Sequence, residues 1–96
     1  MIISFGNKAT SDLFNGTSSR WVRKLPNQIH ETALYKLDVI NAAQNIDDLK
    51  SPPGNRLELL KGDLAGYHSI RINSQWRIVF RWDSNAAHDV QIVDYH

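Results

Sequence analysis

The strongest constraint on the fold is a helix-breaking segment in the middle of the chain. Residues 51–55 include Pro52, Pro53 and Gly54. The two prolines remove backbone donors and Gly54 permits a positive φ, so no helix continues through this segment. Helical spacing of apolar residues precedes it and strand-like alternation follows it. We therefore expect the segment to be the crossover from a helical layer to a sheet.

The long helix is expected after Pro26, a residue that suits a first helical turn. One apolar stripe follows at spacings of four, four and three, formed by Ile29, Ala33, Leu37 and Ile40. Such spacing puts all four side chains on one face of a helix of about five turns. This face is expected to pack against the core.

Shorter elements complete the expected fold. Residues 2–5 are expected to form a short strand, and residues 8–15 a short helix that ends near Gly16. Alternation predicts strands over Tyr67 to Ile72, Trp76 to Trp82 and Asp89 to Tyr95, with a further short strand at Arg56 to Leu60. The fold class is α+β, with two N-terminal helices packed on a mainly antiparallel sheet of about four to five strands.

The register of the first hairpin can also be predicted. If residues 73–75 form a three-residue turn, Ile70 faces Ile78 and all the apolar side chains share one side of the sheet. Arg71 then lies opposite Arg77. Like charges opposed across strands are unfavourable on their own, so this pair suggests an anionic ligand.

Length and composition exclude several classes of protein. A chain of 96 residues is too short for two cores, so a single domain over residues 1–96 is expected. The lack of cysteine suits a reducing cytoplasm, and the histidines have no metal-ligand spacing, so no metal is expected. The apolar start, residues 1–5, is too short for a signal peptide or membrane span. We expect a cytoplasmic protein.

Charge is informative through its distribution. The formal net charge is only +1, which does not by itself indicate a nucleic-acid binder. Residues 56–82, however, carry five basic side chains and only two acidic ones, Glu58 and Asp63, so the segment has a local net charge of +3. The basic residues in that segment are Arg56, Lys61, Arg71, Arg77 and Arg81. They form either a solvated charged face of the sheet or a site for an anion.

A set of motifs in the C-terminal half resembles one family of toxins. The motifs are the segments 51–58, Lys61-Gly62-Asp63, 66–71, Gln75-Trp76-Arg77 and the terminal Asp94-Tyr95-His96. In this order they resemble the HigB toxins of the RelE/ParE-like superfamily, which belong to type II toxin–antitoxin systems. Residues 1–50 add only a compatible length and helix pattern.

The resemblance implies a RelE-like fold and a metal-independent endoribonuclease that cleaves messenger RNA in the ribosomal A site. It implies no cofactor. The implied partners are the ribosome, its messenger RNA and a HigA-type helix-turn-helix antitoxin, with operator DNA contacted only through the antitoxin.

The resemblance also implies roles for individual residues. Lys61 and Arg77 correspond to phosphate-binding cations that stabilise the transition state, and Asp94, Tyr95 and His96 to the terminal catalytic group. RNA-binding candidates are Arg56, Lys61, Arg71, Arg77 and Arg81. Because a charged strand position contributes little to a core, Arg77→Ala is expected to remove activity and leave the fold intact.

One position departs from the family pattern. Some members have a catalytic histidine where this chain has Glu58. An exposed glutamate titrates near pH 4 and is therefore a poor proton donor at neutral pH. Glu58 serves either as a general base or as a solvent-facing residue that pairs with Arg56 or Lys61. Three functions therefore stay open: the ribonuclease, a ParE-like inhibitor of DNA gyrase, and a non-catalytic module that binds RNA or the antitoxin.

Overall fold

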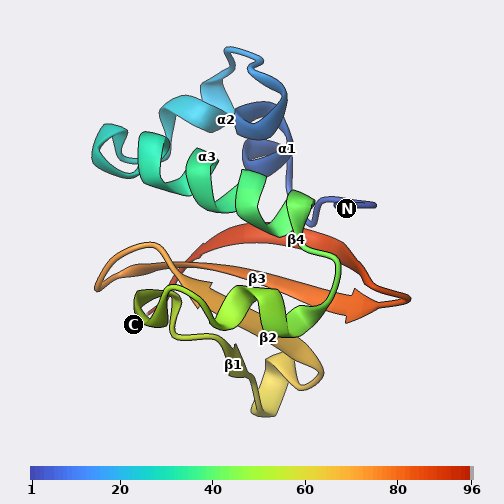
Figure 1. Ribbon diagram of the computed structural model, residues 1–96. Helices are drawn as coiled ribbons and strands as arrows, with labels where there is room; N and C mark the ends of the chain where they lie inside the picture. Colours follow the sequence, from blue (N-terminus) through green and yellow to red (C-terminus); the bar gives the residue numbers. More distant parts are fainter. Residues whose placement is uncertain (96) are drawn as a thin grey trace.

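The computed structural model describes residues 1–95, and its helices cover one face of a sheet (Figure 1). The helices are α1 (Lys8–Asn15), α2 (Arg20–Arg23) and α3 (Asn27–Ala42). The strands are β1 (Glu58–Leu59), β2 (Tyr67–Arg71), β3 (Trp76–Asp83) and β4 (Ala86–Asp94). Within the described residues the sheet has four strands in the order β1-β2-β3-β4, with every neighbouring pair antiparallel. The expected α+β class is confirmed.

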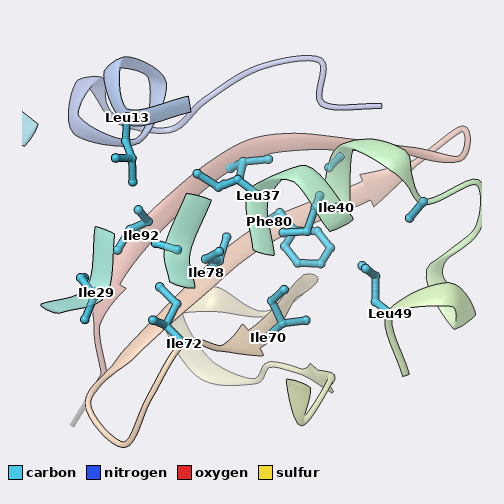
Figure 2. Packing of buried hydrophobic residues seen from close by; sticks show 14 of the residues in the cluster. Leu13, Ile29, Leu37, Ile40, Leu49, Ile70, Ile72, Ile78, Phe80 and Ile92 are labelled. Atoms are coloured by element: carbon cyan, nitrogen blue, oxygen red, sulfur yellow. The ribbon is translucent and has the colours of Figure 1, made fainter. Parts of the chain in front are cut away.

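The predicted stripe of α3 forms the centre of the core. Ile29, Ala33, Leu37 and Ile40 are all buried. Figure 2 shows the larger of these side chains packed against Ile70, Ile78, Phe80 and Ile92 of the sheet. Burial of each such aliphatic side chain contributes roughly 1.5–3 kcal/mol. Pro26 lies at the N-cap, just before the first helical turn.

The expected helix over residues 8–15 is present as α1, and its ends explain its length. The side chain of Asn7 accepts a hydrogen bond from the backbone N–H of Thr10 at 3.0 Å, which caps the start. Gly16 ends the helix with a φ of 73°, which suits a residue without Cβ. Thr10 is fully buried and its Oγ1 accepts from the N–H of Ile92 at 2.9 Å, so α1 is tied to β4.

The first hairpin has the predicted register. Ile70 pairs with Ile78 and Arg71 pairs with Arg77. Oδ1 of Asn73 accepts from the backbone N–H groups of Gln75 and Trp76, both at 2.8 Å, so an asparagine side chain closes the turn that has no glycine.

Several details of the fold differ from expectation. The four-residue helix α2 was not predicted; its start is capped by Ser19, whose Oγ accepts from the N–H of Val22 at 3.2 Å. β4 begins at Ala86 instead of Asp89. The alternation did not reveal its first residues, because Asp89 lies at a bulge inside the strand and has a φ of 53°. The strand expected at Arg56 to Leu60 shortens to the two residues of β1, since Arg56 has a left-handed backbone that ends the extended segment.

The N-terminal segment lies beside β4 and is not a continuous strand. Ile2 and Phe5 form isolated parallel bridges with Ala87 and Val90. Between the bridges, Oγ of Ser4 accepts from the backbone N–H of Asp89 at 2.9 Å. The bulge at Asp89 therefore interrupts the pairing predicted for residues 2–5. Among the described residues, no helix has the length and apolar content needed to cross a membrane.

Candidate active site

A hollow of about 280 Å³ lies at the end of the sheet where β2 turns into β3. We call it the arginine pocket, and its lining residues are Arg56, Glu58, Arg71, Asn73, Ser74, Arg77 and Tyr95. Arg71 and Arg77 alternate with the core residues Ile70 and Ile78, so they project from the sheet face opposite to the helices. The fold thus turns the predicted cross-strand arginine pair into one wall of a pocket.

Arg77 is the most constrained cation of the arginine pocket. Its Nη2 donates a hydrogen bond to the carbonyl oxygen of Arg56 at 2.7 Å, and its Nη1 lies 3.6 Å from Oε1 of Glu58. Its guanidinium carbon lies 5.3 Å from the centroid of the Tyr95 ring. The residue is only 8% exposed. The premise that Arg77, as a charged strand position, contributes little to the core is therefore wrong, because three neighbours enclose its side chain.

Arg71 is held less tightly. It is half-buried and directly opposite Arg77. No carboxylate among the described residues forms an ion pair with Arg71, whereas Arg77 has Glu58. Among the described residues, the arginine pocket is lined by three arginines, Arg56, Arg71 and Arg77, and by one carboxylate, Glu58. This excess of positive charge suits an anion with several oxygens.

Glu58 belongs to the arginine pocket, but its partner differs from the one expected. If Glu58 were not a general base, it was expected to pair with Arg56 or Lys61. The carboxylate instead lies beside Arg77, because β1 places Glu58 on the same sheet face, opposite Ser69. Its side chain is 51% exposed, so one carboxylate oxygen can reach a bound ligand.

The two described residues of the predicted terminal group, Asp94 and Tyr95, lie in different surroundings. Tyr95 lies over Arg77 and lines the arginine pocket, and its backbone N–H donates to the carbonyl of Gln75 at 2.6 Å. Asp94 is the cross-strand neighbour of Trp76, and its Oδ2 accepts from Nε2 of Gln75 at 3.1 Å. Asp94 does not line the arginine pocket. His96 lies outside the described residues, and the catalytic roles of all three stay predictions.

Two predicted RNA-binding cations lie away from the arginine pocket. Lys61 is exposed in the connection after β1. Arg81 pairs with Asp89, with Nη2 2.7 Å and Nε 2.8 Å from the same carboxylate oxygen. The hydrogen bond that Arg81 donates to Asp89, followed by the charge of that carboxylate, raises the pKa of Arg81. Their contact with RNA stays a prediction, and any such contact extends beyond the arginine pocket.

Sequence reasoning missed two residues beside the arginine pocket. Lys36 of α3 donates from Nζ to Oδ1 of Asn55 at 2.7 Å. Its own burial, followed by the charges of Arg71 and Arg77, lowers the pKa of the Lys36 amine. Nothing in the helical pattern separates Lys36 from an ordinary solvated lysine. Asn55 was identified only as part of the helix-breaking segment, yet it is just 2% exposed.

The described histidines lie elsewhere. The imidazole of His68 stacks on Phe80 with ring centroids 6.1 Å apart, and burial lowers its pKa. Nε2 of His30 lies 2.9 Å from the carbonyl of Leu25. Within residues 1–95, no group of three histidine, cysteine or acidic side chains is placed to hold a metal ion.

Comparison with known proteins shows the family. The family model described as the RelE-like toxin of type II toxin–antitoxin system HigB matches residues 4–96. Toxin HigB-1 of Vibrio cholerae serotype O1 is 45% identical over 65 residues, which cover 68% of each chain. Endoribonuclease HigB of Proteus vulgaris is 34% identical over 97 residues, which cover 100% of each chain.

Solved structures of low sequence identity share the fold. A YoeB–YefM complex from Staphylococcus aureus has a chain that superposes with a TM-score of 0.61 at 19% identity, covering 100% of this chain and 98% of that one. YafQ from E. coli superposes with a TM-score of 0.63 at 10% identity, covering 98% and 93%. Because the family model spans nearly the whole described domain, this chain belongs to the HigB-like family of RelE-like toxins of type II toxin–antitoxin systems.

Proposed function

We propose that this chain is an endoribonuclease that inhibits translation by cleaving messenger RNA in the ribosomal A site in the cytoplasm. The observation that carries the proposal is the opposition of Arg71 and Arg77 in a pocket whose described lining includes one carboxylate, that of Glu58. A phosphodiester supplies the negative charge that this pair lacks. The family, and the name of the Proteus vulgaris relative as an endoribonuclease, support the same activity.

The chemistry needs no metal. The ribose 2′-oxygen attacks the adjacent phosphorus, the bond from phosphorus to the 5′-oxygen breaks, and the products are a 2′,3′-cyclic phosphate and a 5′-hydroxyl. A base takes the proton of the 2′-hydroxyl and an acid gives one to the departing 5′-oxygen. Charge builds up on the non-bridging oxygens, where Arg71 and Arg77 stabilise it.

The proton acceptor is proposed from position and chemistry, and the proton donor from chemistry alone. Glu58 is our candidate base, because its ion pair with Arg77 orients it within the arginine pocket. His96 is our candidate acid, since an imidazole titrates near neutral pH and none of the described histidines lines the arginine pocket. Tyr95 packs on Arg77, and Lys61, Arg56, Arg81 and Asp94 are proposed to contact RNA or to support the reacting groups.

The size of the arginine pocket supports the proposed dependence on the ribosome. A pocket of about 280 Å³ accommodates little more than a phosphate and its sugar, so the alignment of the RNA strand must come from another surface. The partner in the cell is proposed to be a HigA-type helix-turn-helix antitoxin, through which the pair contacts operator DNA. The YoeB neighbour, which was solved in complex with YefM, supports an antitoxin partner of some type.

The direct test is to add the purified protein to programmed ribosomes and map the RNA ends. We expect cuts in the A-site codon with cyclic-phosphate ends, and little cutting of the same RNA without ribosomes. Co-purified antitoxin should block the cuts. Equal cutting of free RNA would exclude the ribosome-dependent mechanism, and inhibition of DNA supercoiling without RNA cleavage would favour the gyrase alternative.

A further inference from the structure

Lys36 links the helical layer to the segment that carries the arginine pocket. It stands one residue before Leu37 of the buried stripe of α3, and its Nζ donates to Oδ1 of Asn55 at 2.7 Å. Residues 53–55 form a 3₁₀ turn between α3 and β1. This is a long-range contact, 19 residues apart in sequence, between a helix and an otherwise irregular segment.

Asn55 is fixed by hydrogen bonds on both sides of its amide. Its Nδ2 donates to the carbonyl oxygens of Leu49 and Ser51 at 3.2 and 3.3 Å, and its Oδ1 accepts from Lys36. Because Asn55 is buried, loss of the Lys36 donor leaves a buried amide oxygen unpaired. We then expect the amide to rotate or to bind a water molecule, and the backbone that carries it to shift as well.

The residue after Asn55 supplies the acceptor that orients Arg77. Arg56 has a left-handed backbone, with φ 47° and ψ 54°, that a residue with a Cβ adopts only when its surroundings hold it. That conformation aims the Arg56 carbonyl at Nη2 of Arg77, 2.7 Å away. Lys36, Asn55, Arg56 and Arg77 therefore form a continuous series of contacts that runs from α3 to the arginine pocket.

We propose that Lys36 is a positioning residue for Arg77, acting through the side chain of Asn55 and the carbonyl of Arg56. The energetic cost of keeping Lys36 charged at this place supports this role. Lys36 is held near two other cations, Arg71 and Arg77, and is partly desolvated, which disfavours its charged form. The hydrogen bond to Asn55 offsets that cost in the folded protein. The effect on RNA cleavage rests on the proposed function, whereas the effect on Arg77 geometry does not.

The test compares Lys36→Met with a matched control, Lys50→Met. The side chain of Lys50 is exposed and pairs with Asp47 at 3.3 Å. The first measurement is the side-chain ¹⁵Nε–¹Hε NMR signal of Arg77, assigned by its loss in Arg77→Lys. We expect this signal to shift in Lys36→Met and to stay in place in Lys50→Met. Lys36→Arg, which keeps a charged donor, should return it toward the wild-type position.

The second measurement is single-turnover cleavage on programmed ribosomes. We expect Lys36→Met to lower the rate by about tenfold, as for a side chain that acts through a network, and Lys50→Met to leave it unchanged. An unmoved Arg77 signal in folded Lys36→Met would overturn the inference, as would a cleavage rate equal to that of Lys50→Met. If Lys36→Met does not fold, Lys36→Gln decides by the same signal. If the wild type does not cleave RNA, the proposed function fails, and the NMR result still decides the positioning role.

Discussion

The ring of Tyr95 covers the guanidinium of Arg77, with 5.3 Å between the ring centroid and the guanidinium carbon. This contact joins the end of β4 to the arginine pocket and supports a prediction about the aromatic ring. Tyr95→Phe keeps the ring over the cation, whereas Tyr95→Ala removes it. We expect single-turnover cleavage to fall by about tenfold in Tyr95→Ala and by much less in Tyr95→Phe. Equal losses in the two variants would assign the role to the hydroxyl instead.

The two cross-strand arginines should differ in their effect on stability. Arg71→Gln and Arg77→Gln are both expected to slow cleavage by about 10²-fold, because each removes a cation from a developing anion. Arg77→Gln should also lower the free energy of unfolding by about 1.5–3 kcal/mol, since it loses its charged hydrogen bond to the Arg56 carbonyl.

Arg71→Gln should leave stability unchanged or slightly higher, because it removes a like charge opposite Arg77. Urea unfolding and cleavage rates of both variants check these expectations, with the exposed Arg23→Gln as the control. If Arg71→Gln is the more destabilised variant, the contacts of Arg77 contribute less to the free energy of unfolding than expected here.

The imidazole of His96 is expected to be required for the chemical step. His96→Gln should slow single-turnover cleavage by about 10²–10⁴-fold, the range for positioned proton transfer. This substitution keeps the chain length, so the terminal carboxylate does not move onto Tyr95. A rate within a few-fold of the wild type would mean that another group donates the proton, and Tyr95, Lys61 and Glu58 would then be examined.

Stability is expected to depend on pH through His68. Burial lowers its pKa in the folded protein, whereas in the unfolded chain it titrates near its ordinary value of about 6.5. As the pH falls through about 6.5, the unfolded state binds the proton first, so the free energy of unfolding decreases. The decrease continues down to the pKa of the folded state.

His68→Phe should remove this contribution and keep the stacking on Phe80. The measurement is urea unfolding of both proteins at about pH 7.5 and about pH 5.5. An equal loss of stability between the two pH values in wild type and variant would show that His68 does not contribute to it.

The elements that could be predicted are those with a repeating pattern. The stripe from Ile29 to Ile40 and the alternation around Ile70 and Ile78 determine α3, β2, β3 and the register that opposes Arg71 to Arg77. In both cases, burial of one face selects the arrangement, and the pattern records that selection. The paired cations of the arginine pocket were therefore accessible from the sequence.

The contacts that could not be predicted depend on single groups brought together by the crossover. The link from Lys36 to Asn55 and the left-handed backbone of Arg56 follow from how residues 51–57 fold back along β2. No periodicity marks them. For the same reason the burial of Arg77 was missed, since the groups that enclose it, the Arg56 carbonyl, Glu58 and Tyr95, are distant from it in the sequence.

The pairing of the N-terminal segment also limits how a partner can attach. β1 is only two residues long, and the outer side of β4 is occupied by the bridges of Ile2 and Phe5. Neither border of the described sheet thus presents a long row of free amide and carbonyl groups, which a protein needs in order to bind by adding a strand. An antitoxin that inserted a strand beside β4 would first have to displace residues 2–5. An antitoxin that leaves these pairings intact is expected to recognise the protein mainly through side chains.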